Sequence, residues 1–250
     1  MLRIFPGPLL HRLSSQVFPA AKKKLLQRLP TSARLLDVGC LGFAQMEAAR
    51  KAGRTDLLHF GVDHAAAESE AIPAGFIFAE ADLRTQGLPY EADIFEAVIA
   101  SHVMEHLPDP VELVAECIRV CKPGGSVYLE CPSERTLLLP GVPFRHEMFC
   151  SFSFYDDPTH TSRPWTPQSL YRLARYFGCE PREAGYVTSL KHRLAFPLLL
   201  PYFLLTRDVV RLEQLLWLSV GWSAFVLIEK PLSLRGKPRF RYYVPHRRQR

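Results

Sequence analysis

The sequence lacks the features that would define a disulfide-rich, zinc-binding or membrane-spanning protein. Its six cysteines include no Cys-x-x-Cys pair, so neither a zinc ribbon nor a disulfide framework is indicated. No uninterrupted apolar run is long enough for a secretory signal or a membrane span. We therefore expect reduced, buried thiols in a cytoplasmic protein. A chain of 250 residues can bury a full core, which favours one main domain with appendages.

Acidic residues are missing from both ends of the chain. Residues 1–36 carry seven Lys and Arg and no acid, and residues 230–250 carry eight and no acid. The remaining 16 basic groups face all 25 acidic ones, so the body is acidic. Basic ends on an acidic body favour attraction to an anionic surface, either lipid headgroups or nucleic acid.

This charge distribution suggests three parts. They are a basic amphipathic N-terminal arm (1–30), a main domain (31–231) and a basic C-terminal tail (232–250). An acid-free start could also be a mitochondrial transit peptide, but the prolines within it break the helix that such a peptide needs. We therefore prefer an arm that docks on the domain or on a membrane face.

A glycine-containing turn follows the first apolar run of the main domain. The run ends in Asp37, then Gly39 and Gly42 follow, and a helical pattern begins at once. Glycine permits positive φ and a close ligand approach, while a helix N-terminus offers free N–H donors. The turn matches only part of a G-x-G-x-x-G pattern, and glycine turns also serve packing, so by itself it does not identify a ligand.

Two carboxylates end the next two predicted strands. Residues 58–63 end in Asp63, about twenty residues after the turn, and residues 76–83 contain Asp82. Further strands are predicted at residues 93–102 and 126–130. An acid at a strand end often caps the next helix, and for either residue alone that alternative stays open. Two acids at one edge of a parallel sheet lie where ligands bind in such folds.

Several motifs together resemble the class I S-adenosylmethionine-dependent methyltransferase family. They are "LLDVGC", "GVD", "AEADL", "DIFEAVIASHVMEHLPDP" and "CKPGGSVYLE", in the order of the family from residue 34 to about 131. The segment "DDPTHTSRPWTPQSLYRLARYFGCEP" is similar to the quinone and polyketide O-methylating types. The resemblance implies an α/β, Rossmann-like, doubly wound seven-stranded sheet and S-adenosylmethionine as the cofactor.

The resemblance also implies which residues contact that cofactor. Asp63 would hydrogen-bond the ribose hydroxyls, Asp82 with Leu83 would meet the adenine, and Asp37 would support the loop and the methionine end. The predicted cofactor-binding set is completed by Gly39, Gly42 and His102.

Residues 102–106 spell H-x-x-E-H, a zinc signature when it lies on a helix. Pro108 and Pro110 follow within four residues and leave no room for such a helix, so no metal is predicted. Glu105 and His106 are instead expected to line the site near the transferred methyl group, where the family commonly shows an acid and a histidine.

A long irregular segment, residues 132–165, is predicted to cover the substrate because loops of this length are usually functional. Within it, His160 is the candidate general base or substrate-orienting group, since imidazole accepts a proton near neutral pH. The alternative is a hinge residue whose ring bonds a neighbouring turn. The predicted catalytic set is His160, His106 and Glu105.

A hydrophobic helical insert, residues 191–219, separates predicted strands at 185–190 and 223–230. Two prolines and flanking arginines limit its first apolar run to about a dozen residues, too short to span a bilayer. An interfacial hairpin with the basic tail against headgroups is expected. An apolar lid or dimer face is the alternative. Each of these favours an apolar acceptor.

The predicted function is methyl transfer from S-adenosylmethionine to an oxygen or nitrogen of a small-molecule or lipid-like acceptor. The alternative is a non-catalytic methyltransferase-like binding or assembly protein, because Leu41 and Phe43 stand where the family usually has glycine and could narrow the methionine slot. A nicotinamide dehydrogenase shares the turn and Asp63 but leaves Asp82 unexplained. RNA methylation ranks lower, since no recognised RNA-binding module accompanies the domain.

Overall fold

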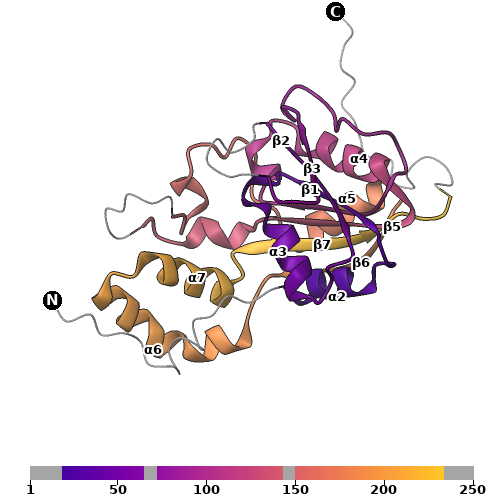
Figure 1. Cartoon of the computed structure of the whole chain (residues 1–250). Coiled ribbons are helices and arrows are strands. Elements are labelled where there is room, and N and C mark those ends of the chain that lie inside the picture. Colours follow the sequence, from indigo (N-terminus) through magenta and orange to yellow (C-terminus); the bar gives the residue numbers. More distant parts are fainter. Residues whose placement is uncertain (1–18, 65–71, 143–149, 234–250) are drawn as a thin grey trace, which may run out of the picture.

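The computed structural model of the protein describes residues 19–64, 72–142 and 150–233. Most of the predicted arm and tail, together with residues 143–149 of the predicted cover segment, lie outside the described residues. Within the described part, a single seven-stranded sheet organises the fold (Figure 1).

The sheet has the strand order β3-β2-β1-β4-β5-β7-β6. Strands β1 to β5 are parallel, and β7 runs antiparallel to both β5 and β6. The chain order reverses at β1, which pairs with both β2 and β4, so a crevice is expected outside the carboxyl ends of these strands. The strand bounds are β1 (Arg34–Val38), β2 (Leu58–Asp63), β3 (Phe76–Glu80), β4 (Phe95–Ser101), β5 (Cys121–Pro132), β6 (Glu180–Tyr186) and β7 (Ser223–Glu229).

Helices cover both faces of the sheet, which explains why its central strands are nearly continuous apolar runs. In β4, Val98 packs with the residues of α4 (Pro110–Val120) and α5 (Pro167–Tyr176), whereas the next residue, Ile99, packs with those of α2 (Ala20–Arg28) and α3 (Ala44–Lys51). Successive side chains of a strand point to opposite faces, so the two hydrophobic clusters lie on opposite sides of the sheet. The expected α/β doubly wound architecture is confirmed.

Helix α2 belongs to the folded domain although the sequence assigned it to an arm. Ala21, Lys22, Leu25 and Leu26 are buried, at the spacing of one helix face. The three apolar residues join the core cluster that contains Leu35 of β1. The predicted arm therefore overlaps the domain over residues 20–28.

The predicted insert is a helical hairpin between β6 and β7, formed by α6 (Leu190–Thr206) and α7 (Val209–Val220). It projects beside the sheet at the lower left of Figure 1 and has its own apolar cluster, which includes Leu199, Phe203 and Leu212. Among the helices of the described residues, none combines the length and apolarity needed to cross a membrane.

Two strand boundaries differ from those predicted. The sixth strand is not at residues 185–190 but at β6, because the Ser189 side chain accepts a hydrogen bond from His192 N–H and begins α6. Strand β3 ends at Glu80, so Asp82 lies two residues beyond the strand. Helices α4 and α5 begin at Asp109-Pro110 and Thr166-Pro167, where the Asp109 and Thr166 side chains cap the first turn.

Candidate functional site

The turn after β1 is shaped by Gly39, which has φ +73°. A Cβ atom at this position would lie 2.3 Å from Cγ2 of Val103, in the segment after β4. Only glycine fits between these two segments without displacement of Val103. The chain then forms a short turn, η1 (Leu41–Phe43), and enters α3, where Gly42 has φ +75° and open space around it.

A cavity of about 540 Å³ opens at the carboxyl ends of β1, β2 and β4. Asp63, Asp82 and Leu83 line it together with Gly39 and His102. His106, Thr159 and Thr161 contribute to the same wall. The two acidic residues therefore share one hollow, as the sequence predicted, and part of the predicted cover segment contributes to it.

The two carboxylates differ in their present partners. Asp63 accepts hydrogen bonds from Leu41 N–H at 3.2 Å and His64 N–H at 2.7 Å, so it also braces the glycine turn. Asp82 is paired with the Arg84 guanidinium through two bonds of 2.8 and 2.9 Å. That pair lowers the pKa of Asp82 to about 2 and keeps the carboxylate ionised.

Leu41 and Phe43 stand where the family usually has glycine, and their side chains lie in different places relative to the first cavity. Leu41 is 59% exposed and lines the cavity beside Asp63. Phe43 packs edge-to-face on Phe76, with ring centroids 4.8 Å apart, and does not line this cavity. The side chain of Phe43 therefore does not fill the hollow.

Asp37 is buried beneath the turn and does not line this cavity either. Burial raises its pKa well above the ordinary value, although the backbone N–H of Gln45 donates to the carboxyl group. This contact joins β1 to the start of α3, which is a loop-supporting position.

A buried network of charges lies behind the cavity. Lys22 pairs with Glu130 at 3.1 Å and donates to Ser101 Oγ at 3.0 Å. His102 approaches Glu105 through Nδ1 at 3.2 Å and Glu130 through Nε2 at 3.5 Å. Burial alone would lower the pKa of His102, but the two carboxylates outweigh it and raise that pKa to about 9. At neutral pH, His102 is therefore a cation held between two carboxylates.

His102 separates the first cavity from a second one of about 610 Å³. Gly42, Lys22 and Glu130 line the second cavity, and Trp217 of α7 forms part of its wall. The hydrophobic insert thus contributes directly to a hollow beside the glycine turn. Sequence reasoning missed Lys22 and Glu130; the apolar spacing of Ala21, Leu25 and Leu26 marks the inner face of α2, and Lys22 lies within that face.

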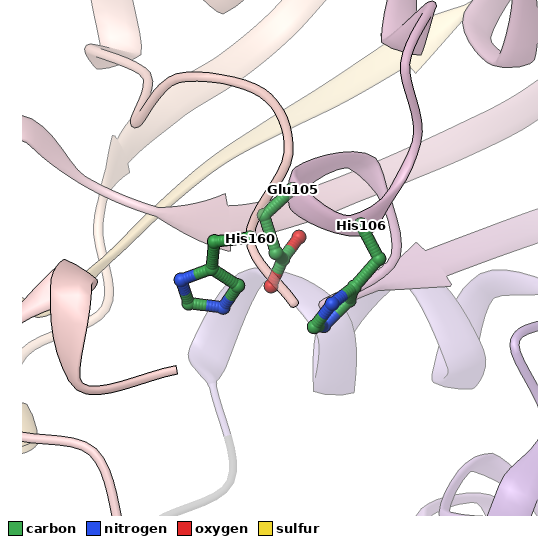
Figure 2. Close-up of side chains that lie close together, drawn as sticks. All are labelled: Glu105, His106 and His160. Carbon is green, nitrogen blue, oxygen red and sulfur yellow. The ribbon is translucent and has the colours of Figure 1, made fainter. Parts of the chain in front are cut away.

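The three predicted catalytic residues lie together (Figure 2). One carboxylate oxygen of Glu105 and one ring nitrogen each of His106 and His160 lie within 4.8 Å of one another. The first two come from the short turn η2 (Met104–His106), and the third comes from the segment after η4 (Phe154–Asp156). His160 also donates through Nδ1 to the Phe154 carbonyl at 2.6 Å, so the predicted bond to a neighbouring turn is present as well.

Comparisons with known proteins agree with this geometry. A family model described as a methyltransferase domain matches residues 9–184. The ubiquinone biosynthesis O-methyltransferase of Methylococcus capsulatus is 36% identical over 103 residues, which are 38% of this chain and 41% of that protein. The chain thus matches about two fifths of the length of such curated relatives.

Two solved structures extend the likeness of fold. Phosphoethanolamine N-methyltransferase 2 of Haemonchus contortus, solved with S-adenosyl-L-methionine, is 18% identical with a TM-score of 0.55, over 88% of this chain and 56% of that one. The [4+2]-cyclase SpnF is 19% identical with a TM-score of 0.53, over 90% and 92% of the two chains. Both likenesses concern the fold alone.

The strand order, with a cavity at the strand tips, defines a Rossmann-like α/β fold. Within that class, the chain belongs to the class I S-adenosylmethionine-dependent methyltransferase family. The prediction of this family is confirmed.

Proposed function

We propose that the protein transfers the methyl group of S-adenosylmethionine to an oxygen or nitrogen of a small-molecule or lipid-like acceptor. The observation that carries this proposal is the shared cavity of Asp63 and Asp82 beside the glycine turn. The ubiquinone O-methyltransferase relatives favour an apolar acceptor that carries a hydroxyl group.

In this proposal, the first cavity holds the adenosine part of the cofactor. Asp63 accepts hydrogen bonds from the ribose hydroxyls, and Asp82 with Leu83 meets the adenine once Arg84 releases the carboxylate. The backbone at Gly39 and Gly42 approaches the methionine part, because glycine leaves the main chain open there. His102, Asp37 and Lys22 then support the site with charge and hydrogen bonds from behind.

Methyl transfer to a hydroxyl group requires removal of the hydroxyl proton and alignment of the acceptor oxygen with the methyl group of the cofactor. His160 takes the proton of the acceptor hydroxyl, with His106 and Glu105 orienting the acceptor. S-adenosylmethionine, held beside Asp63, Asp82 and the glycine turn, would supply the methyl group to the acceptor oxygen. The sulfonium is already a reactive donor, so positioning supplies most of the barrier reduction.

Calorimetric titration with S-adenosylmethionine, S-adenosylhomocysteine and NAD tests this function. Binding of the first two, without NAD, is the expected result. A response to NAD alone would instead indicate a dehydrogenase.

A binding or assembly role without turnover is the second candidate. The Asp82–Arg84 ion pair occupies the carboxylate that adenine would meet, and exposed Leu41 narrows the same cavity. SpnF has a similar fold under the name of a cyclase, so the fold alone does not fix the reaction. The absence of binding by all three ligands would favour this candidate.

We also propose that α6 lies against a lipid surface. Four of its leucines are between 62% and 85% exposed and recur at near-helical spacing along the hairpin: Leu190, Leu194, Leu198 and Leu205. An apolar stripe on one helix face fits a membrane interface, and the acid-free tail of the sequence would add attraction to anionic headgroups.

A further inference from the structure

Glu105, His106 and His160 form a set of metal-ligand type rather than three unrelated polar groups. Their ligand atoms lie within 4.8 Å of one another, and Figure 2 shows the Glu105 carboxylate between the two imidazole rings. Bonds of about 2.0–2.2 Å to one ion would place the ligand atoms about 3–4 Å apart. Side-chain movements of about 1 Å would therefore close the set on an ion.

The hydrogen bonds of His106 and His160 both use Nδ1, which leaves Nε2 of each ring to face a ligand. The Thr159 hydroxyl donates to the Asp157 carboxylate at 2.6 Å, so its oxygen accepts from Nδ1 of His106 at 3.0 Å. His160 donates through Nδ1 to the Phe154 carbonyl. Nε2 is thus the ring atom left to bind a ligand, and Nε2 of His160 also faces the Asp157 carboxylate at 3.4 Å. A second shell of partners orients both rings, as is usual for metal-binding histidines.

Glu105 supplies a second, independent observation at the cluster. The residue is only 1% exposed, and its Oε1 faces His102 at 3.2 Å. Its Oε2 is buried without a hydrogen-bond partner among the described residues. A buried carboxylate oxygen without a partner is costly, because it has lost its water and gained nothing in exchange.

We propose that Glu105, His106 and His160 bind one divalent transition-metal ion of the Zn²⁺ type. Two imidazoles and one carboxylate suit first-row transition ions, whereas Mg²⁺ and Ca²⁺ prefer oxygen ligands alone. The ion would satisfy Oε2 of Glu105, and its charge would be favoured by the Asp157 carboxylate, which lies 3.4 Å from Nε2 of His160. Sequence reasoning excluded a metal because it considered only ligands within residues 102–106, without His160.

Three protein ligands leave coordination positions open, as in catalytic metal sites. His106 and the neighbouring Thr159 line the first cavity, so an open position would be accessible from there. An acceptor hydroxyl bound at that position would be acidified by the ion and would lose its proton to solvent, and this role rests on the proposed function. One lone pair cannot both bind an ion and accept a proton, so His160 in the metal-bound protein acts as a ligand instead of a base.

Calorimetric titration of the chelator-treated full chain with ZnCl₂, and with CoCl₂ followed by visible absorption, tests the site. The expected result is one ion per chain, with the absorption of Co²⁺ bound to nitrogen and oxygen ligands. His160→Ala and the isosteric Glu105→Gln should each weaken binding by about 100-fold or more, since even outer-shell changes cost about 10- to 100-fold.

His64→Ala is the matched control, because His64 also lines the first cavity but lies outside the cluster. Its metal affinity should equal that of the unmodified protein, and circular dichroism should show all variants folded. Absence of binding by both ions contradicts the proposal, and so does equal affinity in folded Glu105→Gln. Titration of S-adenosylmethionine in the presence of chelator tests the proposed function separately, so the two failures are distinguishable.

Discussion

Lys22 illustrates how a single buried charge fixes the back of the site. Its ammonium pairs with Glu130, which in turn faces His102, so α2, β5 and the end of β4 are joined by one set of charges. The pKa of Glu130 is held below its ordinary value, because the Lys22 and His102 charges outweigh the opposing effect of burial. Both partners of the Lys22–Glu130 pair are almost fully buried.

Lys22→Met should lower the free energy of unfolding by about 3 kcal/mol, because it leaves Glu130 buried with one cation fewer. Urea denaturation at neutral pH measures this loss. Lys23→Met on the same helix is the control, since Lys23 is exposed and its replacement should cost little. Equal losses in the two variants would contradict the structural role given to Lys22.

Gly39→Ala should destabilise the protein by about 2–3 kcal/mol, because the new Cβ combines a strained positive φ with overlap against Val103. Gly42→Ala has the same φ strain without the overlap and should cost only about 1 kcal/mol. Denaturation of both variants separates the two effects. The added substitution Val103→Ala should recover part of the Gly39→Ala loss; no recovery would show that the overlap is not the cause.

At the residue scale, Asp63 and Asp82 at the strand ends could be predicted from the sequence, whereas the buried charged residues behind the first cavity could not. Asp63 and Asp82 were found because a strand end and a fixed sequence interval mark them. His160 was suspected on chemistry alone, and only folding brings it to Glu105. Lys22 was missed because a cation on a helix is normally solvated, and its burial depends on a partner 108 residues away.

Among the elements, the parallel strands could be predicted because short apolar runs, bounded by turn residues such as glycine, recur along the sequence. The position of the sixth strand could not be predicted, because the apolar pattern there is compatible with a strand although Ser189 begins helix α6. The insert was recognised from its hydrophobicity. Its role as a wall of the second cavity depends on packing that periodicity does not contain.

Leu194→Glu with Leu198→Glu should abolish flotation with anionic liposomes, because both side chains lie on the exposed stripe of α6. Leu138→Glu is the control: this leucine is 89% exposed but lies on η3 (Glu134–Leu138), outside α6 and α7. Flotation assays of the three proteins measure the effect. Unchanged flotation of the double variant would remove α6 from the membrane proposal.

His192 of α6 should make the fold sensitive to acid. Burial lowers its pKa from 6.5 to about 4, and Lys191 adds to the shift. The folded state therefore favours the neutral ring of His192. The contribution of this ring to the free energy of unfolding is complete above pH 6.5 and is lost as the pH falls towards 4.

Compared with His192→Leu, the unmodified protein should lose about 2 kcal/mol more stability on acidification across this window, given the direction and size of the shift. Urea denaturation at several pH values measures the difference. Parallel pH profiles of the two proteins would contradict a buried neutral imidazole.

In the whole molecule, the first and second cavities lie next to each other, and His102 lines both of them. In the proposed function, the first holds the adenosine part of the cofactor, and the second is walled by the insert and lies beside the glycine turn. The insert therefore lies next to the place proposed for the cofactor.

The affinity for S-adenosylmethionine, measured by calorimetry on the unmodified protein, Asp63→Asn and Glu80→Gln, tests this account most directly. Asp63 lines the first cavity, whereas Glu80, its register partner on β3, does not. Loss of a charge-assisted bond to the ribose should weaken binding by about 10- to 100-fold in Asp63→Asn and leave Glu80→Gln unchanged. Equal affinities in all three proteins, or no binding by the unmodified protein, would contradict the assignment of this cavity to the cofactor.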